Sequence, residues 1–193
     1  MTARVTRAGF LWAGAAAAGG ATVALRGGDG ASHAAPAKSA DREVLAFFLT
    51  LEQVQEAFYR QAVESGGLDG ELLELASRVG AQEREHAALL AQRLGGTAPP
   101  PPASDFGDAF DSPVRFREAA VELEETALAG YVGQAGNLSR KAIAVVATLV
   151  SVEARQVAWL RDLAGISPAP RAADPARKAD AVLRELRDKG YIA

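Results

Sequence analysis

Cysteine is absent from the 193-residue chain, and neither basic nor acidic residues strongly outnumber the other. Without cysteine the chain can form no disulfide, thiolate metal site or thiol nucleophile, so any metal must be held by oxygen and imidazole. The 21 basic and 24 acidic residues give a formal net charge of −3, which offers no basic face to a nucleic acid. Hydrophobic residues make up 49% of the chain, enough for one domain with a substantial core.

The first 37 residues are typical of an export signal. Arg4 and Arg7 precede an uncharged stretch over residues 8–25, and Ala-Pro-Ala at 35–37 offers a cleavage signal. The segment "TRAGFL" is similar to a twin-arginine signal, although an alanine stands where the second arginine belongs. We predict export to the periplasm, the cell envelope or the exterior, with no membrane contact after cleavage. A retained membrane anchor is the alternative, because the stretch is just long enough to cross a bilayer.

Four long segments with an apolar period of 3.6 residues predict four helices. They run from about Asp41 to Glu64, from Asp69 to Gly95, from Ser112 to Gly136 and from Ser139 to Gly165. Asp69 and Ser112 stand at N-cap positions, and Pro113 follows in the first turn, where its missing N–H is harmless. Only a few residues join the first helix to the second and the third to the fourth. Each pair is therefore expected to form an antiparallel hairpin.

A proline-rich segment joins the two hairpins. "GGTAPPPPASDFGDAFDS" covers residues 95–112, and its four consecutive prolines favour an extended chain that can run the length of a bundle. One long crossover between two hairpins is a known four-helix bundle layout. We therefore predict an all-α bundle over residues 38–168 and a tail over residues 169–193, whose short fifth helix packs across one end of the bundle.

The first helices of the two hairpins share a pattern, as expected for copies of one unit. In "LEQVQEAFY" and "LEETALAGY" a tyrosine follows the glutamate by seven residues, so Glu52 corresponds to Glu124 and Tyr59 to Tyr131. This spacing places the tyrosine two turns beyond the glutamate on the same helix face.

The second helices of the hairpins also align, with one difference. Matching "EREHAALL" to "EARQVAWL" sets Glu83 on Glu153 and His86 on Gln156. The first helix thus carries Glu-x-x-His, whereas the second carries Glu-x-x-Gln. The side chains at these two positions lie on one face of a helix.

Four glutamates, one from each helix, are expected to point into a common core. Each interrupts an apolar stripe of its helix. Carboxylates gathered in an apolar core cannot all stay ionised unless cations neutralise them. Iron(II) and manganese(II) suit carboxylate and imidazole ligands. The core therefore binds metal, or its glutamates are protonated, hydrogen-bonded or hydrated.

With these residues, the chain resembles the ferritin-like superfamily over residues 41–165. More narrowly, it is similar to exported bacterial ferritin-like proteins of the desiccation-related type. Di-iron members supply one glutamate from each of two helices and a Glu-x-x-His from each of the other two. The resemblance implies that the metal ligands are Glu52, Glu83, His86, Glu124 and Glu153, with Gln156 as a weak or lost ligand.

The glutamine at position 156 leaves two functions open. The first is an exported ferritin-like protein that binds one or two iron or manganese ions in the bundle core, with oxidation of iron(II) by oxygen or peroxide as its chemistry. The second is a non-catalytic cell-envelope or stress-protection bundle that has lost metal binding. Glu56 is interpreted as a solvent-accessible boundary residue, and Phe47, Phe58 and Trp159 as packing residues. Neither the oligomeric state nor an enzymatic activity follows from the sequence.

Overall fold

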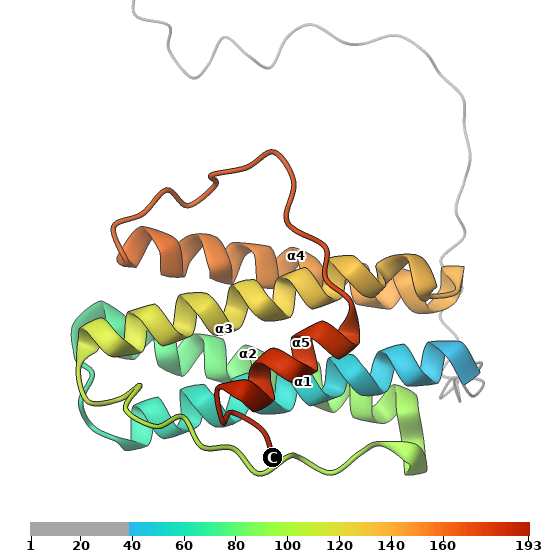
Figure 1. Ribbon diagram of the computed structural model, residues 1–193, viewed down its shortest axis with the longest axis horizontal. Coiled ribbons are helices and arrows are strands. Elements are labelled where there is room, and N and C mark those ends of the chain that lie inside the picture. Colours follow the sequence, from blue (N-terminus) through green and yellow to red (C-terminus); the bar gives the residue numbers. More distant parts are fainter. Residues whose placement is uncertain (1–38) are drawn as a thin grey trace, which may run out of the picture. The chain divides into compact units, whose positions relative to one another are not determined.

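The computed structural model describes residues 39–193, so the predicted signal segment lies outside the described residues. Five helices are present, and residues 39–193 contain no strand. The helices are α1 (Ser39–Glu64), α2 (Gly70–Leu94), α3 (Pro113–Gln134), α4 (Arg140–Leu163) and α5 (Ala179–Asp188), with short 3₁₀ turns η2 (Gly95–Thr97) and η3 (Ala135–Asn137). The predicted all-α fold with four long helices is confirmed (Figure 1).

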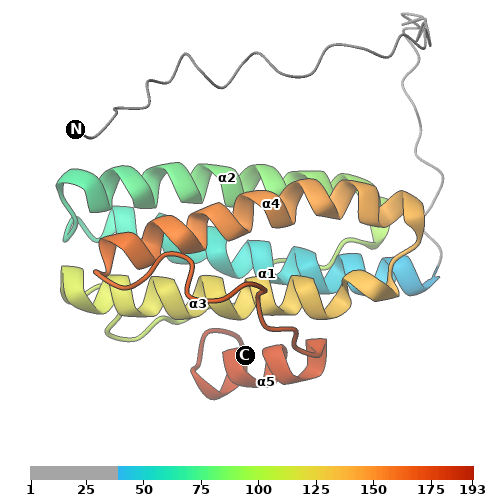
Figure 2. The ribbon, with the colours of Figure 1, turned by 90° about the horizontal axis from the view of Figure 1, so that it is seen from above.

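The four long helices form two antiparallel hairpins, α1 with α2 and α3 with α4 (Figures 1 and 2). The crossover between α2 and α3 runs back along the bundle, so α3 begins at the end where α2 begins. As a result α3 is parallel to α2, and α4 is parallel to α1. This arrangement brings one face of every helix to a common core, as the sequence predicts.

The helix starts follow the capping residues. Ser112 accepts a hydrogen bond from the N–H of Arg115 at 3.3 Å, and Pro113 is the first residue of α3. Asp69 occupies the N-cap of α2 without a side-chain capping bond. The Asp41 carboxylate accepts hydrogen bonds from the Ser139 backbone N–H at 2.7 Å and the Ser139 hydroxyl at 2.6 Å. This contact joins the starts of α1 and α4.

Aromatic side chains tie the crossover to both hairpins. Phe58 of α1 lies 5.2 Å from Phe106 and 5.1 Å from Phe110 of the crossover, between ring centroids. The Phe116 ring of α3 stacks on Phe58, with ring centroids 5.7 Å apart. Phe58 is completely buried. Its predicted role as a packing residue is confirmed, and the crossover is part of the core.

The tail packs along the side of α3, and the predicted placement across one end of the bundle is wrong (Figure 2). The Arg177 N–H donates to the Ala129 carbonyl at 2.9 Å. Val182 and Leu186 of α5 are buried in the core cluster. The chain before α5 lies directly on Gly133, where a side chain would collide with it. Glycine at this point, near the C-terminal end of α3, lets the backbone of the tail approach the helix closely.

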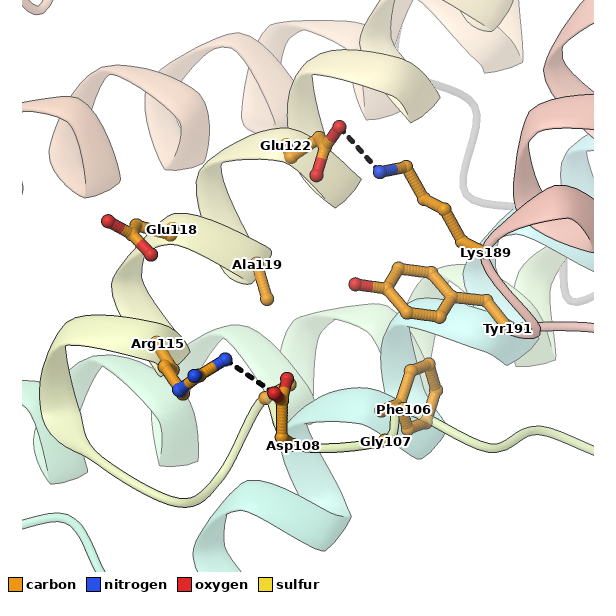
Figure 3. A pocket seen from close by; sticks show the side chains of 10 residues that line it. Phe106, Gly107, Asp108, Arg115, Glu118, Ala119, Glu122, Lys189 and Tyr191 are labelled. Atoms are coloured by element: carbon orange, nitrogen blue, oxygen red, sulfur yellow. Dashed lines mark hydrogen bonds and ion pairs between the residues drawn. The ribbon is translucent and has the colours of Figure 1, made fainter.

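The C-terminal residues, α3 and the crossover line a pocket of about 280 Å³ (Figure 3). Lys189 Nζ lies 2.6 Å from the Glu122 carboxylate on one side of the pocket. Tyr191 packs against Phe106, with ring centroids 5.1 Å apart. None of the predicted metal ligands lines this pocket. It is therefore a feature of the tail's attachment, separate from the glutamates of the core.

Replacing Gly133 with alanine is expected to displace the tail. The new Cβ would lie 1.9 Å from the Arg177 carbonyl oxygen, a backbone atom that cannot rotate away. Overpacking of this kind destabilises proteins by about 1–3 kcal/mol. Limited proteolysis should cut the variant faster between residues 170 and 193. Gly136→Ala is the matched control, because no atom lies within 4 Å of its Cβ. Equal cleavage of both variants would show that the contact does not hold the tail.

Candidate metal centre

The structure buries every predicted ligand, and the four long helices supply them. The exposed fractions are 0% for Glu52, Glu83, Glu124 and Glu153, 7% for His86 and 3% for Gln156. An apolar core holds these polar groups because each glutamate sits within the buried stripe of its own helix. Their burial confirms the sequence-based expectation that they point inward.

Four of these residues converge on one point. The His86 Nδ1 atom lies 3.2 Å from Glu52 Oε2, 3.4 Å from Glu83 Oε2 and 3.0 Å from Glu153 Oε1. One ligand atom from each residue lies within 4.8 Å of all the others. Oxygen and nitrogen ligands bind transition metals at about 2.0–2.2 Å, so atoms around one ion lie at most about 4.4 Å apart. A small contraction of this four-ligand group would therefore enclose one ion.

The four-ligand group has more acceptor oxygens than donors. The Nδ1 atom of His86 can carry only one proton, and it is hydrogen-bonded to Glu52 at 3.2 Å. Glu83 Oε2 and Glu153 Oε1 are buried and accept no hydrogen bond. Buried polar atoms are nearly always satisfied in folded proteins. A divalent cation would satisfy these oxygens, so the residues fit a metal ion.

Glu124 is buried beside the four-ligand group but is not part of it. Its Oε2 atom instead accepts a hydrogen bond of 2.7 Å from Gln55 Nε2. Gln55 is completely buried, and the sequence analysis did not single it out. The available signal was its spacing, since Gln55 follows Glu52 by three residues just as Gln156 follows Glu153. Of these two glutamines, only Gln156 aligns with a histidine, His86, in the comparison of the two hairpins.

Gln156 turns its amide nitrogen toward the centre. Nε2 donates to Glu83 Oε1 at 2.7 Å and to Gln82 Oε1 at 3.1 Å. The amide oxygen accepts no hydrogen bond. Glu56, by contrast, is partly exposed, and its carboxylate lies 3.6 Å from Arg60 Nε. This position agrees with its interpretation as a boundary residue.

The two core tyrosines cross between the hairpins. The Tyr131 hydroxyl of α3 donates to Glu52 of α1. The Tyr59 hydroxyl of α1 faces Glu124 of α3, without a well-aligned hydrogen bond. The hydroxyl of each tyrosine thus points toward the glutamate of the other hairpin. This exchange is what a two-fold relation between two similar hairpins produces.

The family of the chain follows from this fold and a sequence comparison. A family model described as a ferritin-like domain matches residues 40–165. The chain belongs to the ferritin-like family. No curated protein matches the chain. The narrower likeness to desiccation-related proteins stays a prediction. In this ferritin-like protein, the matched residues contain all the residues of the centre.

The ferritin-like centre favours neutral carboxyl groups and a charged imidazole when no metal is bound. Burial and the charge of Glu52 raise the pKa of Glu153 to about 7. Burial and neighbouring carboxylates raise the pKa of Glu83 and of Glu124 as well. Burial lowers the pKa of His86, but the Glu153 and Glu52 carboxylates beside its ring outweigh burial and raise the pKa to about 10. A proton on His86 thus takes the place of a cation.

The metal-free ferritin-like protein is expected to lose stability as pH rises. A carboxyl whose pKa rises on folding contributes stability below its unfolded value, 4.5 for Glu153, and loses it as pH passes the folded value of about 7. His86 acts in the same direction, between 6.5 and about 10. The loss for Glu153 is roughly 2–4 kcal/mol.

Thermal unfolding in chelator at pH 5.5, 7 and 8.5 measures this dependence. The same series with manganese(II) should run the other way, because metal binding requires deprotonated ligands. A metal-free protein whose melting temperature rises from pH 5.5 to 8.5 would show that these carboxyl groups are not held neutral.

Proposed function

We propose that this protein is an exported ferritin-like protein that holds iron(II) or manganese(II) in its buried centre. The observation that carries the proposal is the four-ligand group, in which three carboxylates surround one imidazole nitrogen inside the core. Two of its carboxylate oxygens have no hydrogen-bond donor. Oxygen and imidazole ligands suit iron(II) and manganese(II).

The residues of the centre have distinct parts in this function. Glu52, Glu83, Glu153 and His86 would hold the ion. Before it binds, His86 must give up its Nδ1 proton, and the carboxyl groups that are neutral must give up theirs. The Tyr131 hydroxyl fixes the orientation of Glu52. When bound, the ion supplies one-electron redox and Lewis-acid chemistry.

Elemental analysis tests metal binding directly. The full chain is purified without chelator, and a second sample is reconstituted with iron(II) or manganese(II) and passed through a desalting column. Retained metal in the wild type, absent from His86→Ala, is the expected result. Glu85→Ala is the matched control, because Glu85 is an exposed glutamate on the same turn of α2. A wild type with no metal above background after reconstitution would refute the proposal.

Oxidation of iron(II) is the finer part of the proposal. Protein loaded with iron(II) without oxygen would be mixed with oxygen or peroxide, and the ultraviolet absorbance of iron(III) followed. The expected result is iron(III) formation faster than in protein-free buffer and lost in His86→Ala. Equal rates of iron(III) formation in the wild type and in protein-free buffer would leave metal binding without redox catalysis as the function.

A metal-free, non-catalytic bundle is the second candidate function. The observation in its favour is Gln156, which stands where a di-iron site has its second histidine and donates its amide to Glu83. The reconstitution experiment decides between the two candidates, since this bundle would retain no metal under any condition.

Export is proposed from residues 1–37 alone. The proposal rests on the two arginines, the uncharged stretch and the Ala-Pro-Ala signal. Sequencing the N-terminus of the chain recovered from a bacterial host is the test, with cleavage before residue 38 as the expected result. An intact N-terminus in the membrane fraction would indicate the retained anchor instead.

A further inference from the structure

Two glutamine side chains lie among the carboxylates of the centre. Gln55 of α1 is completely buried, and Gln156 of α4 is 3% exposed. Both turn the amide nitrogen toward carboxylate oxygens. Both amide oxygens are buried without a hydrogen-bond donor. The orientation of each amide is therefore set by donation to the carboxylates.

The Gln55 amide lies between two carboxylates from different helices. Its Nε2 atom is 2.7 Å from Glu124 Oε2 and 3.3 Å from Glu153 Oε2. An ion that bridged these two carboxylates would have to occupy the same place. The amide has two N–H groups, so one nitrogen can donate to both oxygens.

The Gln156 amide has a counterpart across the bundle. His86 of α2 lies 3.0 Å from Glu153 of α4, and Gln156 of α4 lies 2.7 Å from Glu83 of α2. The two contacts are equivalent under the relation between the hairpins. A neutral imidazole nitrogen has a lone pair that a metal can use, whereas an amide NH₂ presents only hydrogens.

Reversing either amide would not restore a ligand without further change. A half-turn of the Gln55 amide would bring its oxygen within hydrogen-bonding distance of two carboxylate oxygens. The same turn at Gln156 would bring its oxygen against Glu83. In the ionised form that metal binding requires, these carboxylate oxygens would repel the amide oxygen. The observed orientation therefore keeps donors at this half of the centre.

We propose that the centre binds a single ion, at the four-ligand group, and that the Gln55 amide fills the second metal position between Glu124 and Glu153. This inference rests on the proposed function and fixes the number of ions, which that function leaves open. Gln55 is a positioning residue that holds Glu124 away from the bound ion. The centre is then a one-metal site within a fold that can hold two.

Reconstitution with manganese(II) tests the number of ions. The full chain would be stripped with chelator, loaded and desalted, and the bound metal counted by elemental analysis. Electron paramagnetic resonance distinguishes an isolated manganese(II) ion from an exchange-coupled pair. The wild type is expected to hold one ion per chain with the signal of an isolated ion. Gln53→Ala is the matched control, since Gln53 lies on the same helix and bonds to the Pro99 carbonyl outside the centre.

Two variants separate the effects of the glutamines. Gln156→His alone supplies the missing imidazole but leaves Gln55 in place, so it should still bind one ion. Gln55→Ala combined with Gln156→His opens the position and should bind two, with a coupled signal. If circular dichroism shows that the double variant does not fold, the number of ions bound by Gln156→His alone tests whether Gln55 fills the second position.

Any other number of bound ions would contradict the inference, and each number would do so differently. Two coupled ions in the wild type would refute the single-ion centre and leave the proposed function intact. No ion in the wild type would refute both. Two ions in Gln156→His, or one ion in a folded double variant, would show that Gln55 does not occupy the second position.

Discussion

Replacing His86 with alanine should lower the free energy of unfolding of the metal-free protein by about 3–5 kcal/mol at pH 8. The imidazole is the one basic side chain that contacts the carboxylates of the four-ligand group within the described residues. Without it, buried negative charges face one another with no partner. At pH 5.5 the loss should be smaller, because protonated carboxyl groups need no counter-charge.

The same substitution should weaken metal binding by more than about 100-fold, since even outer-shell changes cost up to that much. Denaturant unfolding in chelator at the two pH values, with Glu85→Ala as the exposed control, measures the stability effect. A loss that is equal at both pH values would indicate a packing defect and would contradict an electrostatic role for His86.

Replacing the whole polar centre with apolar residues should make the metal-free bundle more stable. Buried ionic groups exchanged for well-packed apolar groups of similar size are often neutral or stabilising by about 1–4 kcal/mol. The variant removes every fully buried polar group of the centre together, and the partly exposed Gln82, which loses its bond to Gln156, can bond to water instead. It carries Glu52→Leu, Glu83→Leu, Glu124→Leu, Glu153→Leu, Gln55→Met, His86→Leu, Gln156→Met, Tyr59→Phe and Tyr131→Phe.

This comparison must be made in chelator, because a metal present at 100 times its dissociation constant stabilises the wild type by about 2.7 kcal/mol. The expected result is a higher denaturation midpoint for the apolar variant than for the metal-free wild type. A lower midpoint at unchanged helix content would mean that the hydrogen bonds of the centre stabilise the fold. In that case the second candidate function, a bundle without metal, would gain support.

The sequence predicts the fold and the inward-facing glutamates well, because both depend on local periodicity. Each glutamate interrupts an apolar stripe, so its helix must either bury it or expose the stripe. The sequence does not indicate that Gln55 is buried, since a glutamine in a helix is most often exposed. Its contacts with Glu124 and Glu153, 69 and 98 positions along the chain, show what it does.

The tail could not be placed from its own pattern. The amphipathic character of α5 requires an apolar surface but does not say which one. Its position is decided by the backbone contact at Gly133, where the preceding chain lies against α3. The separation of Glu124 from the other glutamates is also a tertiary effect. It depends on which hydrogen-bond donor reaches each carboxylate, and helix periodicity carries no information on that.

The long crossover between α2 and α3 has a consequence for the symmetry of the centre. A four-helix bundle assembled from two identical hairpin chains would carry every residue twice, so a histidine in one hairpin would always be matched by a histidine at the same position of the other. The crossover places both halves in one polypeptide, and each half is then encoded separately. His86 and Gln156 can therefore differ. A single-chain bundle can thus carry different side chains on the two sides of its centre. A hairpin that pairs with an identical copy cannot.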